Sequence, residues 1–300
     1  MRHDQIPIDV PTAQALIRQQ FPHLRSEPIR FLPSTGTVNA IFRVGDLLAA
    51  RFPLHESDPA ELAESLSTDA DAMGELAGRS PVPTPTCVGL GRPDKSYPLP
   101  FTLQTWIPGH VATPTMVSDS PKFAADLVRF IQALRATDLD GRSFNGRGRG
   151  GALPDHDEWM EHCFTRSAGL LDVPRLRWMW AGFRGLPAGG NDTMSHGDLT
   201  PANLLVDGGR LAGVLDGGGF APADPSLDLV AAWHLLGRPA RTPFKEGLGS
   251  SDVEWQRGAA WAFQQAMGLV WYYQRSNPAM AGLGRSTVER LLDDPEVGAR

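Results

Sequence analysis

The sequence SHGDLTPANLLVDGGRLAGVLD, residues 195–216, is the most informative segment of this chain of 300 residues. Two apolar runs, 204–206 and 211–215, flank Asp207-Gly208-Gly209, whose glycines tolerate the positive φ angles of a tight turn. The pattern predicts a β-hairpin, and a hairpin brings its two open ends together. Residues that enter and leave this hairpin are therefore expected to lie side by side.

Three oxygen-bearing side chains are expected at the open end of this hairpin. Asn203 enters the first arm, Asp216 leaves the second, and Asp198 precedes Asn203 on a loop stiffened by Pro201. Two carboxylates and one amide oxygen are ligands that Mg²⁺ takes beside the phosphates of a nucleotide. One carboxylate would remain to act as a base. The segment therefore predicts a site for phosphate chemistry.

The composition argues against several classes of protein, namely nucleic-acid-binding, membrane-spanning and disulfide-rich proteins. Lys and Arg total 28 against 34 for Asp and Glu, a net charge of −6, and no basic block is present, which argues against nucleic-acid or anionic-membrane partners. No apolar run approaches the roughly 18 residues of a membrane span, and the first residues lack a signal-peptide core. Cys87 and Cys163 are too few for a disulfide framework. We therefore expect a cytoplasmic globular protein.

The order of the expected elements divides the chain into two lobes. We predict a mostly β lobe at 1–105 and a mostly helical lobe at 106–300, an α+β fold with an N-terminal antiparallel sheet and one main helix beside it. In the first lobe the patterns predict a helix over 8–21, a hairpin of 40–44 and 47–52, a helix over 59–77, an extended edge at 82–89 and a strand at 101–107. In the second lobe they predict helices over 123–134, 156–182 and 252–274.

The central segment also resembles a known family. His196-Gly197-Asp198, four further residues, Asn203, the hairpin and Asp216 are similar to the catalytic and metal-binding loops of protein-kinase-like phosphotransferases. The glycine after the histidine, with Asp224-Pro225-x-x-Asp228-Leu229, resembles the aminoglycoside phosphotransferase family and its small-molecule kinase relatives. The likeness extends to 36–39, 51–53, 106–109 and 255–273. It implies a two-lobe protein-kinase-like fold.

The resemblance implies roles for the residues around the phosphates. Asp198 would accept the proton of an acceptor hydroxyl, or orient that hydroxyl, for in-line attack on the γ-phosphate of ATP or GTP. Asn203 and Asp216 would hold Mg²⁺ against the phosphates. Arg51 stands where most kinases carry lysine and would contact phosphate.

The same resemblance implies supporting roles elsewhere. The acid that pairs with Arg51 would be Asp69 or Glu64, on the helix that follows. The backbone of Thr35, Gly36 and Thr37 would cover the phosphates, and main-chain groups of Gln104, Trp106 and Ile107 would meet the adenine edge. His196 and Asp228 would tether the catalytic loop.

One departure from the family pattern follows Asp216. Relatives commonly place an aromatic residue there, whereas this chain has Gly217-Gly218-Gly219-Phe220. We expect this loop to be more mobile and the nucleotide pocket beside the metal to be roomier. The glycine run also motivates one alternative function, a non-catalytic nucleotide-binding module.

Other motifs are better explained without chemistry. Gly146-x-Gly148-x-x-Gly151 has the spacing of a dinucleotide fingerprint, but no strand precedes it and arginines fill its gaps. Ser195, His196 and Asp198 are too close in sequence to form a hydrolytic relay. No GxxxxGK[ST] loop is present, which excludes a P-loop enzyme. Asp224-Pro225 has the residues of a helix start, an N-cap followed by proline.

The resemblance suggests the acceptor class. It implies an aminoglycoside or another hydroxylated natural product as phosphate acceptor. Glu161, Trp255 and Tyr272 are candidate acceptor contacts, and acids near 155–158 would attract a cationic substrate. The alternative within enzymes is a kinase for a small alcohol such as choline, homoserine or a sugar, for which the late Trp and Tyr residues could provide an aromatic cage.

Overall fold

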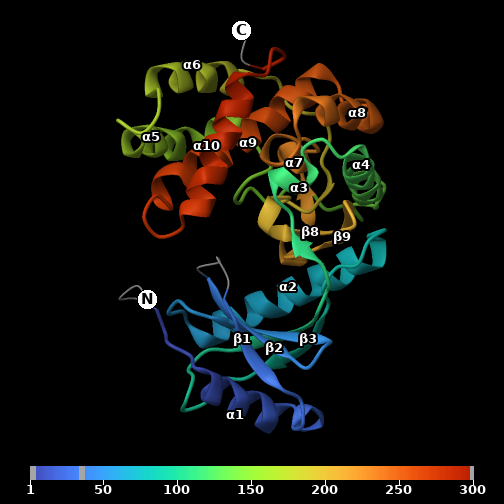
Figure 1. Cartoon of the computed structure of the whole chain (residues 1–300), viewed down its shortest axis with the longest axis vertical. Helices are drawn as coiled ribbons and strands as arrows, with labels where there is room; N and C mark the ends of the chain where they lie inside the picture. The colour runs from blue at the N-terminus through green and yellow to red at the C-terminus, as the bar shows by residue number, and fades with distance from the viewer. Residues whose placement is uncertain (1–4, 34–37, 298–300) are drawn as a thin grey trace. The chain divides into compact units, whose positions relative to one another are not determined.

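A computed structural model describes residues 5–33 and 38–297 (Figure 1). Their contacts divide the chain into two compact units. Unit 1 takes in the chain up to residue 78, then 83–108 and 216–219, and unit 2 takes in 79–82, 109–215 and 220 onward. The boundary thus falls after Pro108 rather than after residue 105, and the glycine run that follows the hairpin belongs to unit 1.

Unit 1 is a five-stranded antiparallel sheet with two main helices. Its strands follow the order β1-β2-β3-β5-β4, so β4 is an edge strand. Prolines before β4 are tolerated there, because an edge strand needs fewer N–H donors for the sheet. The elements are α1 (Val10–Gln20), β1 (Ile29–Leu32), β2 (Asn39–Val44), β3 (Leu48–Pro53), α2 (Pro59–Arg79), β4 (Cys87–Gly91) and β5 (Phe101–Thr105).

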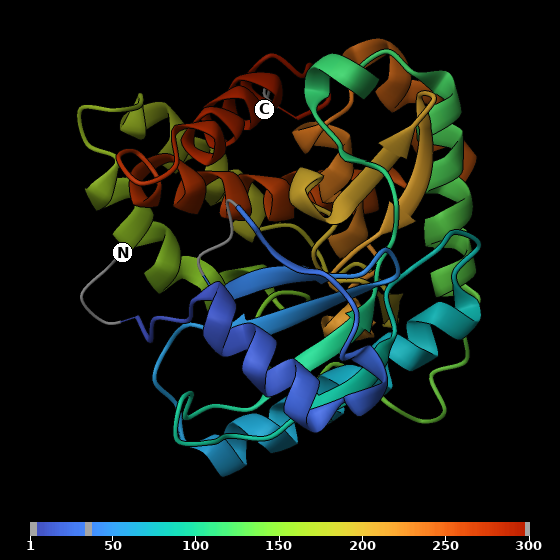
Figure 2. The same cartoon turned by 60° about the horizontal axis from the view of Figure 1, so that its bottom comes forward.

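Alternation of side chains along the strands separates two faces of this sheet. Phe52 of β3 and Phe101 of β5 point to the α1 side, where their rings stack with centroids 4.3 Å apart within a buried apolar core. Figure 2 shows α1 lying across this face. Arg51 and Gln104, one residue out of phase, point to the opposite face and line a cavity beside α2. Charged and polar groups of β3 and β5 are therefore collected on the α2 side.

Unit 2 is mostly helical and contains two small sheets, of order β6-β8-β9 and β10-β7. Its helices are α3 (Pro114–Val117), α4 (Pro121–Arg135), α5 (Asp157–Arg166), α6 (Val173–Arg184), α7 (Val230–His234), α8 (Arg238–Leu248), α9 (Asp252–Tyr272) and α10 (Pro278–Leu292). Its strands are β6 (His110–Val111), β7 (Thr193–Ser195), β8 (Leu204–Asp207), β9 (Arg210–Val214) and β10 (Ala221–Ala223).

The single helix predicted over 156–182 is wrong, because the structure has α5 and α6 there. The chain breaks at 167–172, where Gly169 has a φ of +75°. Pro174 then begins a new helix, and the carboxylate of Asp172 accepts from the N–H of Arg175. Proline is favoured in a first helical turn and disfavoured in a helix interior, so these residues specify a restart.

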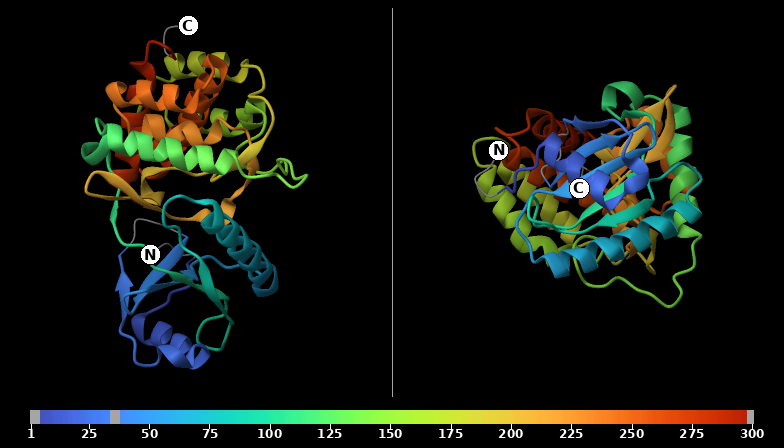
Figure 3. Two further views of the ribbon diagram at one scale, coloured as in Figure 1. Left: turned by 90° about the vertical axis from the view of Figure 1, so that its right-hand side faces the viewer. Right: turned by 90° about the horizontal axis from the view of Figure 1, so that it is seen from below.

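Helix α9 is the centre of unit 2. Almost all of its residues from Trp255 to Val270 are buried, and it packs against α5, α7 and α10. Figure 3 shows α4 running beside α8, where Gln132 donates to the carbonyl of Gly247 over 2.8 Å. Within the described part of the chain, no helix combines the length and apolar character that a membrane span requires.

Candidate active site

The hairpin predicted from the sequence is formed by β8 and β9, with Gly208-Gly209 as its turn. Its ladder continues to the open end, because the N–H of Leu215 donates to the carbonyl of Asn203 over 2.7 Å. Asp216 is the next residue and has a φ of +63°. Aspartate tolerates this left-handed conformation better than most residues do, and such strained positions cluster at functional sites.

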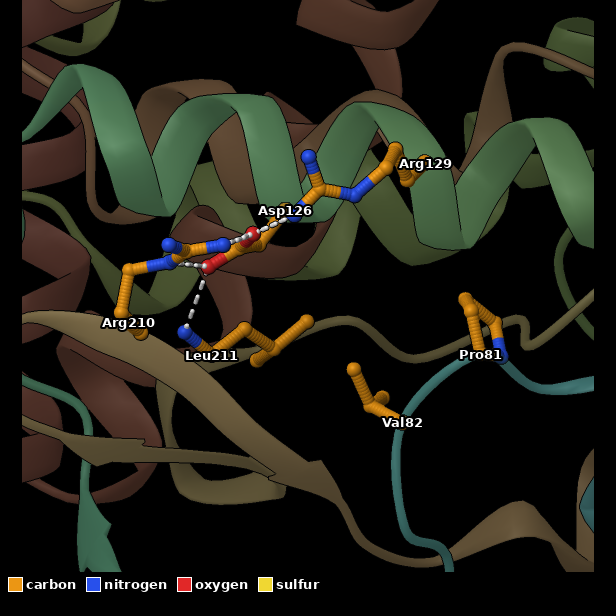
Figure 4. Close-up of a pocket in the computed structure, with 6 residues that line it drawn as sticks. All are labelled: Pro81, Val82, Asp126, Arg129, Arg210 and Leu211. Carbon is orange, nitrogen blue, oxygen red and sulfur yellow. Dashed lines mark hydrogen bonds and ion pairs between the residues drawn. The ribbon is translucent and has the colours of Figure 1, made fainter.

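A buried carboxylate fixes the hairpin to α4 (Figure 4). Asp126 accepts two hydrogen bonds from Arg210, over 2.5 and 2.6 Å, and one from the N–H of Leu211 over 3.2 Å. Arg129 also pairs with it. Burial opposes ionisation of Asp126, but these donors outweigh it and keep the pKa below its usual value. The ionised form is therefore stable, and it pins β9 in place.

Asp228 and His196 hold the loop that connects β7 to the hairpin. The two carboxylate oxygens of Asp228 accept from the N–H groups of His196 and Gly197, each over 3.0 Å. The N–H of Asp198 donates to Nδ1 of His196 over 3.3 Å, so the ring proton lies on Nε2, which donates to the carbonyl of Leu215 over 2.9 Å. The loop is thereby tied to both the hairpin and the chain beyond β10.

Asp198 and Asn203 are in direct contact. Nδ2 of Asn203 donates to the main-chain oxygen and to Oδ2 of Asp198, each over 2.9 Å. This use of the amide nitrogen leaves Oδ1 of Asn203 as a possible metal ligand. Among the described residues, no three His, Cys, Asp or Glu side chains converge on a metal site by themselves. Oδ1 of Asn203 is an oxygen ligand of the kind that Mg²⁺ takes, because this ion usually binds one or two protein oxygens together with phosphates.

In unit 1, Arg51 forms an ion pair with Asp216, with 2.8 Å between Nη1 and Oδ1. In this structure Arg51 thus pairs with Asp216, and neither Asp69 nor Glu64, the two predicted partners, forms an ion pair with it among the described contacts. Glu64 is exposed, whereas Asp69 lines the same cavity of about 70 Å³ as Arg51 and Asp216. Burial raises the pKa of Asp69, the nearby Asp216 raises it further, and Arg51 opposes this.

The glycine run brings Asp216 to this cavity. A Cβ atom on Gly217 would overlap the side chain of Leu76, and one on Gly218 would lie 2.9 Å from Cβ of Asp69. Larger residues would therefore push the loop away from α2. The glycines replace the expected aromatic residue with close backbone packing inside unit 1.

Comparison with known proteins identifies the family. A profile of the phosphotransferase enzyme family matches residues 32–261, well over half of the chain. The chain belongs to this family. It is 28% identical over 163 residues to an aminoglycoside 3'-phosphotransferase of Escherichia coli. That match covers 44% of this chain and 60% of the relative, so it spans less than two thirds of the curated protein.

Solved structures show the same fold. The GDP complex of wild-type aminoglycoside 2'-phosphotransferase-IIIa has a TM-score of 0.71 at 19% identity and covers 94% of this chain and 98% of its own. A macrolide 2'-phosphotransferase from Brachybacterium faecium has a TM-score of 0.60 at 16% identity and covers 94% and 99%. The predicted α+β class, with an antiparallel-sheet lobe and a larger helical lobe, is confirmed.

In this phosphotransferase family member, some of the main-chain groups predicted to meet the adenine edge already form hydrogen bonds within the protein. The N–H of Trp106 donates to the carbonyl of Leu47 over 2.7 Å, so it is not free for a base, and the guanidinium of Arg43 lies 3.8 Å above its ring. Gln104 is buried and lines the unit 1 cavity. Ile107 follows Trp106 just before the unit boundary. Thr35, Gly36 and Thr37 lie outside the described residues.

The three residues predicted to contact the acceptor differ in how accessible they are. Glu161 pairs with the guanidinium of Arg177 through both carboxylate oxygens. Trp255 is 3% exposed and its ring lies 4.5 Å from that of Trp233, so it offers an acceptor almost no surface. Tyr272 is 41% exposed at the end of α9.

Sequence reasoning missed three residues that contact Asp198 directly or through a neighbour. Arg149 and Gln265 donate to Oδ1 of Asp198, and His234 is hydrogen-bonded to Gln265. The only sequence feature that could have pointed to Arg149 is the presence of arginines in the glycine-rich loop 146–151. That loop matches a dinucleotide-binding fingerprint by spacing alone. Gln265 and His234 carry no motif that distinguishes them from other helical residues.

Proposed function

We propose that this family member is an ATP- or GTP-dependent phosphotransferase that moves the γ-phosphate to a hydroxyl of a small molecule. The observation that carries the proposal is the pair Asp198–Asn203, held on a loop that Asp228 ties down by two hydrogen bonds. Phosphoryl transfer depends on positioning and charge more than on covalent chemistry, and this loop supplies a fixed carboxylate.

Each residue then has a defined task. Asp198 would orient the acceptor hydroxyl and take its proton as the bond to phosphorus forms. Oδ1 of Asn203 and the carboxylate of Asp216 would hold Mg²⁺, which neutralises phosphate charge. Arg51, paired with Asp216 in this structure, would turn to a phosphate when the nucleotide binds, because Arg presents several donors in a planar fork.

The face of α9 that begins at Gln265 is the proposed acceptor surface. Gln265, Gly268 and Tyr272 are spaced by three and four residues and so lie on one face of the helix. Trp159 of α5 packs on Gly268, where a Cβ atom would lie 2.9 Å from its ring, and Trp159 is 40% exposed. With a helical rise of about 1.5 Å per residue, this aromatic surface begins about 5 Å along the axis from Gln265.

Two of the acids around this surface are paired within the chain. Asp157 accepts from Arg184 and from the indole of Trp180, and hydrogen bonds from Arg184 lower the pKa of its carboxyl. Glu161 is likewise held by Arg177. Asp155 and Glu158 are exposed, and no ion pair to either is found among the described residues. It is therefore the aromatic surface, rather than the charge, that leads us to favour a hydroxylated natural product with an apolar face.

The small-alcohol alternative is weaker for a related reason. A choline site needs an aromatic cage open to a cation. The guanidinium of Arg166 already lies 5.1 Å from the Trp271 ring, the best-placed cage member after Trp159. No observation favours homoserine or a sugar.

Transfer of labelled γ-phosphate from ATP and from GTP tests the proposal. The acceptor panel contains macrolides, aminoglycosides, choline, homoserine and simple sugars, with Asp198→Asn as the control of strongly reduced but measurable activity. We expect Asp198-dependent transfer to an apolar hydroxylated compound. Nucleotide binding without transfer to any acceptor would instead favour the non-catalytic module.

Gly268→Ala tests the acceptor surface separately. The added methyl group should displace the ring of Trp159 and raise the KM for the acceptor about 10-fold, while the KM for nucleotide stays the same. Gly282→Ala is the matched control, because a Cβ atom there meets nothing within 4 Å. An unchanged acceptor KM in Gly268→Ala would place the acceptor elsewhere.

A further inference from the structure

The catalytic loop does not hold the carboxylate of Asp198 alone. Nη2 of Arg149, from the loop between α4 and α5, donates to Oδ1 of Asp198 over 2.8 Å. The Arg149 and Asp198 side chains are 31% and 38% exposed, so the pair is partly desolvated and still open to a substrate. Nε2 of Gln265, on α9, approaches the same oxygen at 3.5 Å. Two elements distant in sequence thus meet at one oxygen atom.

The loop that carries Arg149 has a rigid base. The N–H of Asp224 donates to the carbonyl of Gly150 over 2.9 Å. The buried guanidinium of Arg257 donates to Asp224 over 2.7 Å and to the carbonyl of Gly151 over 3.3 Å. Asp224 thus has two tasks, because Oδ1 accepts from the N–H and the hydroxyl of Ser226 while Oδ2 accepts from Arg257. Its buried ion pair fixes the two residues that follow Arg149.

Gln265 is fixed from behind by a buried chain of hydrogen bonds. Its Oε1 lies 2.8 Å from Nε2 of His234, whose Nδ1 lies 3.0 Å from the hydroxyl of Thr287. His234 and Thr287 are fully buried. Burial lowers the pKa of His234 to about 4, so its ring is neutral at pH 7.

The carboxylate of Asp198, at the end of this series of hydrogen bonds, fixes which group donates in each of them. An ionised carboxylate can only accept, so the amide nitrogen of Gln265 faces Asp198 and its oxygen faces His234. Nε2 of His234 must then carry the ring proton, and the bare Nδ1 faces the hydroxyl of Thr287, which also donates to the carbonyl of Leu283 over 2.9 Å. The donors of His234 and Gln265 both point toward Asp198, and hydrogen bonds aligned in this way polarise one another.

Counting acceptor sites identifies the reactive oxygen. A carboxylate offers about four lone-pair sites. Oδ1 of Asp198 accepts from Arg149 and Gln265, and Oδ2 accepts from Asn203. Among the contacts of the described residues, one site on Oδ2 is left.

We propose that Arg149 and Gln265 are positioning residues that fix Oδ1 of Asp198 and so present Oδ2 to the acceptor hydroxyl. This inference rests on the proposed function. The loop 146–151, which has no role as a dinucleotide fingerprint, then serves to carry Arg149 to the catalytic carboxylate. Gln265 serves the same carboxylate from α9, at the end of the proposed acceptor surface.

Steady-state kinetics of Arg149→Met, Arg149→Lys and Gln265→Leu test this. We expect Arg149→Met to lower kcat about 30-fold with nucleotide KM unchanged, since small misplacements of a reacting group cost up to about 100-fold. Gln265→Leu should lower kcat less, because its contact is longer. Arg149→Lys should restore part of the loss. Arg147→Met, an exposed arginine of the same loop, is the matched control and should leave kcat unchanged.

Two further measurements separate positioning from folding. Guanidinium ion added to Arg149→Ala should raise its kcat several-fold and leave the wild type unaffected. In an Asp198→Asn background, Arg149→Met should cause no further loss, because residues that act as a unit are non-additive. Independent losses, or a kcat of Arg149→Met equal to that of the wild type, would overturn the proposal. A wild-type chain that transfers no phosphate would instead overturn the proposed function itself.

Discussion

The catalytic loop of unit 2 and the charged cavity of unit 1 are built in opposite ways. In the loop, Asp198 and Asn203 are five positions apart, and several hydrogen bonds hold them, some from the loop itself and some from the distant Asp228. In the cavity, Arg51 and Asp216 are 165 residues apart and meet through one ion pair. The loop is fixed by several directional hydrogen bonds at once, whereas the cavity depends on one ion pair and on how the glycine run packs on α2.

This difference separates two kinds of functional residue. A carboxylate that must be aligned with a reacting hydroxyl is held by several directional bonds. The two charges proposed to neutralise phosphate share one ion pair and stay partly exposed, 25% for Arg51 and 50% for Asp216. The second kind can exchange an internal partner for a substrate at little cost, because exposed ion pairs contribute only about 0–1 kcal/mol.

Asp198→Ala should have the largest effect on catalysis. It removes the aligned carboxylate, and we expect kcat to fall about 1,000-fold, within the range measured for general bases. Nucleotide affinity should stay nearly the same, because the charged cavity of unit 1 is intact. Initial rates with labelled nucleotide check the fall in kcat, and a direct binding measurement checks the nucleotide affinity. A weak, uniform effect on both would contradict the assigned role.

Asp216→Ala should show the contrasting behaviour. It removes one proposed oxygen ligand and the partner of Arg51, so the KM for the Mg²⁺-nucleotide should rise at least about 10-fold, the size of the loss when one charged contact is removed. A titration of Mg²⁺ at fixed nucleotide should show a higher requirement. Asp207→Ala, at the other end of the hairpin and exposed, is the control.

Asp228→Ala should convert the rigid loop into a loose one. The buried N–H of His196 loses its acceptor, and the half-buried N–H of Gly197 keeps only its bond to Oγ of Ser195, at a cost of about 1–3 kcal/mol. Unfolding in denaturant should show this loss, and kcat should fall with it. Asp228→Asn keeps the shape and one acceptor oxygen, so an intermediate loss is expected. Full stability in Asp228→Ala would mean that the loop is held by its other bonds.

Asp69→Asn should have the smallest effect, and it should depend on pH. The folded state raises the pKa of Asp69, so the ionised carboxylate destabilises the fold above that pKa and the cost disappears as the group is protonated. The variant should melt about 1–2 °C above the wild type at pH 7. The gain should shrink as the pH falls toward 4. A lower melting temperature at pH 7 would show that Asp69 stabilises Arg51 instead.

The local parts of the site were predictable. The hairpin of β8 and β9, the loop before it and the contact of Asp198 with Asn203 follow from turn glycines, apolar runs and a spacing of five residues. In unit 1 the hairpin of β2 and β3 followed from two apolar runs around a tight turn, whereas strand β1 was not predicted. Such patterns constrain residues that are close in the chain, where the geometry allows few arrangements.

The errors concern residues that are far apart. The family resemblance offered Asp69 or Glu64 as the partner of Arg51, but it carried no information on the glycine run that brings Asp216 there. Trp255 was assigned to an acceptor from its residue type, whereas packing against Trp233 buries it. Arg149 was set aside with its loop, although it reaches the carboxylate of Asp198.

The amino-acid order by itself therefore determined the family, the two-part α+β architecture and the identity of the carboxylate and amide at the mouth of the hairpin. Only the tertiary structure decided which charges meet: Arg51 with Asp216, and Arg149 with Asp198. The physical reason is the distance along the chain over which each interaction acts. Turn chemistry and side-chain periodicity act over a few residues, while an ion pair between distant segments exists only after helices and strands have packed and fixed where each side chain ends.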